Sequence, residues 1–142
     1  MINAIFHAHS GLRFAILLAG VVALVILALG ASGDRPYERQ SRGALAIFTG
    51  LLDLQILLGI AMVVLGCFYG ALMGHLMMML LAAVAVHGTS VYARKQTNGR
   101  RAHTIALVGL LLGLGLIAGG IAAIGRSPIS SSHQPTCPAA TK

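Results

Sequence analysis

The N-terminal stretch HAHSGLR (residues 7–13) places histidine and arginine side chains at the start of a long apolar run. His9 and Arg13 are four residues apart, so a helix puts them on one face. His75 lies on a different apolar run, directly after Gly74. Imidazoles from two helices can ligate a haem iron, and an arginine beside them can neutralise a propionate. The residue types therefore indicate a haem site, with His9 and His75 as metal ligands and Arg13 as a cofactor contact.

Other side chains within apolar runs are further candidates for chemistry. His87 follows His75 by twelve residues, about 18 Å along a helix, so it cannot share the same haem. It could ligate a second haem with His103, although His103 follows two arginines and an ordinary interfacial role is favoured for it. Asp53 could be protonated, pair with Arg13, or act as a proton-relay or quinone contact.

Two methionines follow His75 at helical spacing. Met78 and Met79 are three and four residues after it, on its face of the helix. A methionine there could lie against the edge of a cofactor, or could simply fill an irregular gap in the core.

The elements that must position these residues are transmembrane helices. The 142-residue chain is 57% hydrophobic and only 9% charged, and its mean hydropathy of +0.87 lies outside the range of soluble domains. Four segments, about 9–30, 43–66, 71–93 and 103–125, are long enough to span a bilayer. We expect an all-α membrane protein, a four-helix up-down-up-down bundle over residues 1–126, with a Ser/Pro-rich tail at 127–142.

The basic residues indicate orientation. The formal charge is +7, but Lys and Arg cluster in the connections near residues 35–42 and 94–101 rather than on a polar face, so we expect no nucleic-acid partner. Under the positive-inside rule both connections are cytoplasmic, and the two termini lie on the outer side of a bacterial inner membrane. His9 and His75 then sit at a similar depth near the outer surface.

Under this topology Cys67 and Cys137 share the oxidising side of the membrane and could form a disulfide. Two unrelated thiols are the alternative. The last apolar run has G-x-x-x-G spacing at Gly109 and Gly113 and again at Gly115 and Gly119. Such spacing lets helices approach closely, within the bundle or between subunits.

The chain resembles a family of small four-helix bacterial membrane proteins labelled cytochrome b-like. The matching stretches are HSGLRF (9–14), RPY (35–37), DLQILLG (53–59), GHLMMM (74–79) and HG (87–88). The chain departs from the family pattern at Asp53, where relatives have histidine, and at Gly74, where they have glutamate. The resemblance implies electron transfer, with any haem depending on His9, His75 or His87.

Motifs for hydrolysis or phosphoryl transfer are absent from the sequence, so whether the chain is an enzyme stays open and a non-catalytic role is favoured. We expect a b-type cytochrome-like subunit that passes electrons within a larger respiratory or photosynthetic membrane complex. The alternatives are a cofactor-free accessory subunit, or a subunit in which histidine ligates bacteriochlorophyll.

Overall fold

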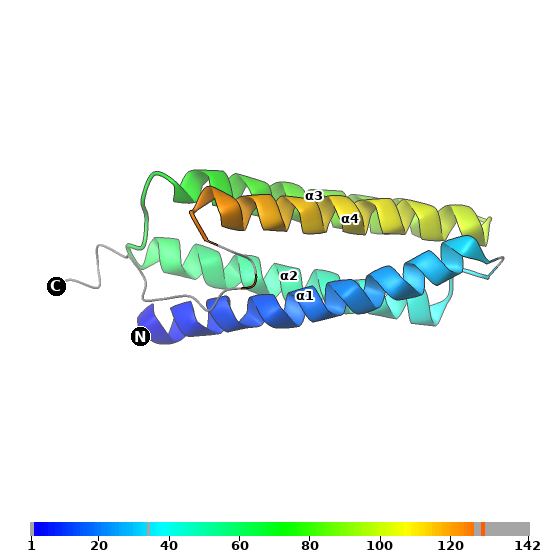
Figure 1. The fold of residues 1–142 in the computed structure, drawn as a ribbon, viewed down its shortest axis with the longest axis horizontal. Helices are drawn as coiled ribbons and strands as arrows, with labels where there is room; N and C mark the ends of the chain where they lie inside the picture. The colour runs from blue at the N-terminus through cyan, green and yellow to red at the C-terminus, as the bar shows by residue number, and fades with distance from the viewer. Residues whose placement is uncertain (1, 34, 127–128, 130–142) are drawn as a thin grey trace.

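The computed structural model describes residues 2–33, 35–126 and 129, and it consists of four helices joined by short connections (Figure 1). They are α1 (Ile2–Ser32), α2 (Arg39–Val64), α3 (Leu72–Arg94) and α4 (Gly99–Ala123). Each is long and apolar enough to cross a membrane, and the described residues contain no strand. The predicted all-α membrane fold is confirmed, and the chain is a multi-pass membrane protein.

Helix α1 begins at Ile2, well before the expected start of the first span at residue 9. The HAHSGLR stretch is therefore helical throughout, and His9 lies inside α1 rather than at its entrance. The predicted tail at 127–142, apart from residue 129, lies outside the described residues. Cys137 is in that region, so the disulfide with Cys67 stays a prediction.

The helices form two hairpins packed on each other. Figure 1 shows α1 and α2 in one layer and α3 and α4 in the other, with consecutive helices running in opposite directions. Helix α1 also packs against α4, whereas α2 and α3 make the fewest contacts of the four neighbouring pairs. The seam between α2 and α3 is therefore the loosest side of the bundle.

At the end of the bundle that holds the α1–α2 and α3–α4 connections, the two layers are bound closely. Arg100 Nε donates a hydrogen bond to the Ala31 carbonyl at 3.1 Å, which satisfies one of the free carbonyls at the end of α1. His103 is almost fully buried there. Its Nδ1 donates to the Gly99 carbonyl at 2.8 Å, and its Nε2 bonds to Ser41 Oγ at 2.8 Å. Both ring nitrogens of His103 are thus used by the protein itself.

Glycines allow α3 and α4 to approach closely. A Cβ added to Gly109 would collide with Thr89, and one added to Gly113 would collide with Val86. Nothing lies within 4 Å of a Cβ placed on Gly115. The first G-x-x-x-G pair therefore serves packing inside the bundle, whereas Gly115 faces outward.

Two helices end with the same turn at the opposite end of the bundle. Gly66 (φ 92°) follows α2 and Gly125 (φ 70°) follows α4, in the left-handed conformation that glycine adopts without strain. The next residues turn back: Cys67 N–H donates to the Met62 carbonyl at 3.0 Å, and Arg126 N–H to the Ile121 carbonyl at 3.3 Å. These are Schellman turns, and they direct Cys67 and Arg126 toward the interior.

Candidate functional site

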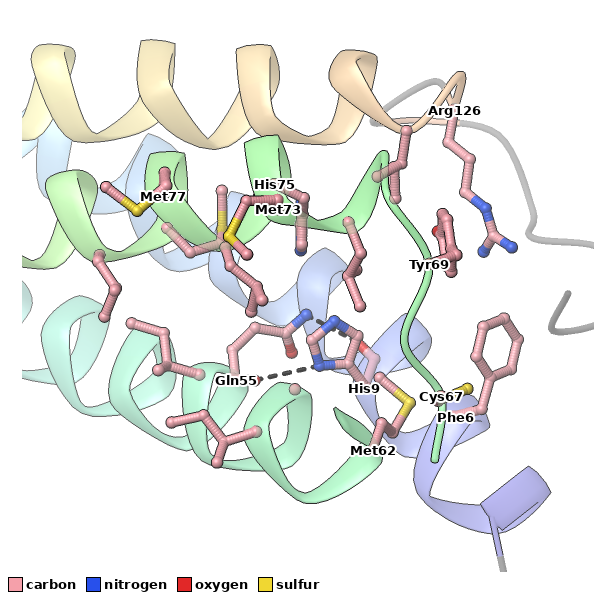
Figure 2. Close-up of a pocket in the computed structure, with 18 residues that line it drawn as sticks. Phe6, His9, Gln55, Met62, Cys67, Tyr69, Met73, His75, Met77 and Arg126 are labelled. Carbon is pink, nitrogen blue, oxygen red and sulfur yellow. Dashed lines mark hydrogen bonds between the residues drawn. The ribbon is translucent and has the colours of Figure 1, made fainter. Parts of the chain in front are cut away.

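The structure brings His9 and His75 together at the end of the bundle where α1 begins. Their ring centroids are 6.4 Å apart and their planes are inclined at 74°. Figure 2 shows the two side chains pointing toward each other, His9 from α1 and His75 from α3. One histidine therefore comes from each hairpin.

Helix α2 holds His9 in position. The His9 Nδ1–H donates to the Gln55 backbone carbonyl at 3.1 Å, and the Gln55 side chain donates from Nε2 to the His9 carbonyl at 2.9 Å (Figure 2). A carbonyl oxygen can only accept, so the proton of a neutral His9 ring is on Nδ1. The Nε2 lone pair is left for another partner.

Helix α4 does the same for His75. Its Nδ1–H donates to the Gly120 carbonyl at 2.9 Å, which again leaves Nε2 as the unprotonated nitrogen. A hydrogen bond from one ring nitrogen to a backbone carbonyl is the usual support for a histidine whose other nitrogen binds a metal. Both imidazoles therefore carry the tautomer that a metal ligand needs.

A cavity of about 340 Å³ lies beside the two rings. Its volume falls at the lower end of the roughly 300–1,000 Å³ of cofactor and small-molecule sites. The wall is mainly apolar, and its polar groups include His9, Gln55, His75 and Arg126. A second cavity of about 60 Å³ shares these four residues and extends toward Arg13. The histidine pair thus lies where a mostly apolar cavity becomes polar.

Gln55 leaves one hydrogen-bonding atom in this wall without a partner. The residue is only 8% exposed, and its Oε1 has no hydrogen-bond partner among the described residues. A buried acceptor of this kind costs about 1–3 kcal/mol unless a donor reaches it. A bound group or water that offers a donor would remove that cost.

The cavity reaches the outward surface of the bundle between α2 and α3. Its wall includes side chains that are about half exposed: Ile60 on α2, and Met73, Met77 and Leu80 on α3. These residues are apolar, as a surface in contact with lipid tails requires. A ligand dissolved in the bilayer could therefore reach the histidines from the side.

Two arginines lie at the site. Arg13 lines the smaller cavity and is buried, with its guanidinium 4.7 Å from the centre of the Phe14 ring. Arg126 lines both cavities and lies 5.3 Å from the centre of the Phe6 ring. Figure 2 shows its side chain extending from the end of α4 toward Phe6 and Tyr69. The two guanidinium groups give the cavity a positively charged side.

The two predicted methionines differ in position. Met79 lines both cavities. Met78 lines neither of them, and it packs against α4, where its Cβ lies within 2.9 Å of a Cβ placed on Gly120. The methionines that line the large cavity beside Met79 are Met62, Met73 and Met77.

His87 and Asp53 lie elsewhere. His87 Nε2 is 2.9 Å from Asp53 Oδ1, and both side chains are about half exposed on the outside of the bundle. Asp53 thus pairs with His87 and not with Arg13. A second haem between His87 and His103 is not supported, because both nitrogens of His103 already have partners.

Sequence reasoning missed Gln55 and Arg126. The signals for Gln55 were its place in the DLQILLG stretch (53–59) and its angular offset from Asp53, because residues two apart on a helix face nearly opposite directions. For Arg126 the signal was the Gly125 that precedes it, which permits the turn back over the cavity.

The described residues contain no group of three or more His, Cys, Asp or Glu side chains that could hold a metal ion together. The site offers a pair of imidazoles and no larger cluster. Comparison with known proteins adds nothing to this geometry, since no family model, curated protein or solved structure matches the chain.

Proposed function

We propose that the chain is a b-type cytochrome-like membrane subunit that holds haem between His9 and His75 and takes part in electron transfer. The observation that carries this proposal is the pair of facing imidazoles from two hairpins, both with Nδ1 bonded to a backbone carbonyl. Haem iron needs only two ligands from the protein, because the macrocycle supplies the others. The absence of a larger ligand cluster among the described residues agrees with this.

The separation of the rings suits a metal bound between them. With metal–nitrogen bonds of about 2 Å, imidazoles on opposite sides of one ion have ring centroids roughly 6 Å apart. The observed separation is 6.4 Å. A single magnesium ligand in a chlorin would leave the second imidazole without a role, so haem is favoured over bacteriochlorophyll.

The surrounding residues suit an apolar macrocycle with acidic substituents. The apolar part of the wall can cover the ring and exclude water, as at other cofactor sites. Arg126 and Arg13 can bind carboxylates through charge-assisted hydrogen bonds. When bound, haem supplies one-electron redox chemistry, while the protein supplies the ligands, the charge and the low dielectric.

The proposed setting is a larger electron-transfer complex in a bacterial inner membrane, with the histidine site near the outer surface. The basic α1–α2 and α3–α4 connections support this orientation by the positive-inside rule.

The test is the reduced-minus-oxidised absorption spectrum of the purified chain and of its histidine variants. His75→Ala and His9→Ala should each remove or shift the haem bands. His7→Ala is the matched control, because His7 is an exposed histidine of the same helix and lines neither cavity. It should leave the spectrum unchanged.

Loss of the fold is separated from loss of a ligand by rescue. His75→Gly should regain the bands when imidazole is added, since imidazole can enter the space left by the side chain. Chlorin bands in the pigment extract would show that bacteriochlorophyll, and not haem, is bound. A purified chain that binds neither pigment would contradict the proposal and leave a scaffold role.

A further inference from the structure

Asp53 and His87 form a hydrogen-bonded pair on the outward face of the bundle, at the seam between α2 and α3. The Nε2 to Oδ1 distance is 2.9 Å, and the side chains remain 48% and 49% exposed. Asp53 lies near the middle of α2, and His87 lies two turns before the end of α3. The pair is therefore exposed at a depth where lipid tails, not water, surround a membrane protein.

Each member of the pair retains one polar atom with no hydrogen-bond partner among the described residues, namely His87 Nδ1 and Asp53 Oδ2. In a bilayer such atoms are costly to expose, and intramembrane polar groups normally face protein or water. A polar surface that covers the pair would remove this cost.

The two outward atoms are complementary to each other. If the pair is aspartate with imidazolium, Nδ1–H points out as a donor and Oδ2 as an acceptor. If the shared proton moves to the carboxyl group, Nδ1 still carries its proton and Oδ2 is still an acceptor. In both net neutral states the surface presents one donor and one acceptor, so it is complementary to a copy of itself.

A two-fold axis along the membrane normal would bring the same surfaces together at the same depth. Such an axis leaves every residue at its own level in the bilayer, and two-fold dimers use the same patch on both subunits. The pair of one copy would then meet the pair of the other, with each His87 Nδ1 donating to the partner's Asp53.

The face beside the pair permits close approach by another helix. Gly50 precedes Asp53 by one turn and Gly88 is adjacent to His87, and both glycines are exposed. A Cβ placed on either would meet nothing within 4 Å. Small residues at a helix surface allow backbones to pack closely in membranes.

The same face continues to the mouth of the cavity. Met73, Met77 and Leu80 lie on the same side of α3 as His87, at successive spacings of four, three and seven residues, and they are exposed. A subunit seated on the seam would therefore cover both the polar pair and the lateral opening of the histidine site.

We propose that a second copy of this chain docks on the α2–α3 seam as a two-fold dimer, with Asp53 and His87 at its centre. This inference goes beyond the proposed function and does not depend on haem. It commits to the second copy because the pair matches itself in donors, acceptors and depth.

The test is the oligomeric state of the full chain in lipid nanodiscs and liposomes, measured by native mass spectrometry and by dilution of the protein with lipid. We expect a dimer for the wild type. Asp53→Leu with His87→Leu should weaken association at least tenfold. Asp53→His with His87→Asp should keep the dimer, because the exchange preserves self-complementarity.

Steric and cross-linking variants locate the interface. Gly88→Leu should block the dimer, whereas Gly115→Leu, an outward glycine on α4, should not. Under oxidation in membranes, Gly88→Cys should form a covalent dimer and Gly115→Cys should not. The proposal would be overturned if the wild-type chain is monomeric, or if the Asp53, His87 and Gly88 variants dimerise as the wild type does. Either result would count whether or not haem is bound.

Discussion

Gln55 and His9 hold each other through two reciprocal hydrogen bonds, one from the glutamine side chain to the histidine carbonyl and one from the imidazole to the glutamine carbonyl. The distances are 2.9 Å and 3.1 Å. Together they fix both the backbone position of His9 and the direction of its ring. This contact links α1 to α2 at the level of the site.

Gln55→Leu removes the side-chain half of this link. The change also removes Oε1, which is buried without a partner among the described residues. Since an unpaired buried acceptor costs about 1–3 kcal/mol and a hydrogen bond contributes about 1 kcal/mol, we expect the free energy of unfolding in detergent to stay the same or rise by up to about 2 kcal/mol. Gln96→Leu is the control, since Gln96 follows the end of α3 and its side-chain amide bonds to the Tyr92 carbonyl at 3.2 Å. That change should stay within about 0.5 kcal/mol. A fall of about 1 kcal/mol or more for Gln55→Leu relative to the control would contradict an unpaired Oε1.

Gly120→Ala should disturb His75. A Cβ there would lie 2.7 Å from Met79 Cε and 3.5 Å from His75 Nδ1, so the wall of the cavity must shift. Gly119→Ala is matched to it, because its Cβ would meet only Met78 Cε at 3.7 Å. Titration with haem should show weaker binding for the first variant and unchanged binding for the second. Identical binding curves would argue against a site next to Gly120.

Gly113→Leu should destabilise the bundle. The added side chain collides with Val86 of α3, and overpacking of this kind typically costs about 1–3 kcal/mol. Gly115→Leu places the same side chain on an open surface and should be tolerated. Thermal unfolding of the two variants in the same detergent measures the difference.

Arg126→Gln should weaken the binding of haem by about 10- to 150-fold, because a charge-assisted hydrogen bond to a carboxylate contributes roughly 1.5–3 kcal/mol. This prediction depends on the proposed function. The control is the dimethyl ester of haem, which has no free carboxylates and should bind the wild type and the variant equally. An equal loss for both ligands would mean that Arg126 acts through packing on Phe6 instead.

Ionisation of Tyr37 should make the stability of the fold depend on pH in the alkaline range. Burial raises the pKa of its hydroxyl above the usual 10.0, because the buried phenolate is disfavoured, although Arg94 and Arg42 oppose the shift. The unfolded chain therefore loses this proton first, and stability should fall as pH rises above about 10.

Tyr37→Phe should remove that part of the pH dependence. The Tyr37 hydroxyl is buried and has no hydrogen-bond partner among the described residues. Its removal should therefore leave stability at neutral pH unchanged or slightly higher. Thermal unfolding of the wild type and of the variant is measured between about pH 8 and 11. The difference between their stabilities at each pH gives the contribution of the Tyr37 hydroxyl. Parallel curves would contradict it.

The helices were predictable because a bilayer demands long apolar segments, and four such runs occupy most of the chain. Helix α1 begins at Ile2, earlier than the expected span, which starts at about residue 9. Residues such as His7 and His9 lower local hydropathy although they continue the helix, so hydropathy marks the lipid-crossing part and not the helix end.

The proximity of His9 and His75 followed from topology and depth, since α1 and α3 begin at the same end of the bundle and each histidine lies near the start of its helix. The pairing of Asp53 with His87 could not be predicted, because the depth of a residue does not say which neighbouring helix its side chain faces. Arg126 depends on a turn after α4, and the pairing of Gln55 with His9 depends on the rotation of α2 about its axis. Both are tertiary features that a single sequence specifies only weakly.

The two histidines come from different hairpins, and this has a consequence for biogenesis. Each hairpin can insert into the bilayer by itself, but the ligand set is complete only after the hairpins associate. A group held by both histidines would stabilise the associated form by mass action. Supply of that group would then govern how much of the newly made polypeptide survives quality control.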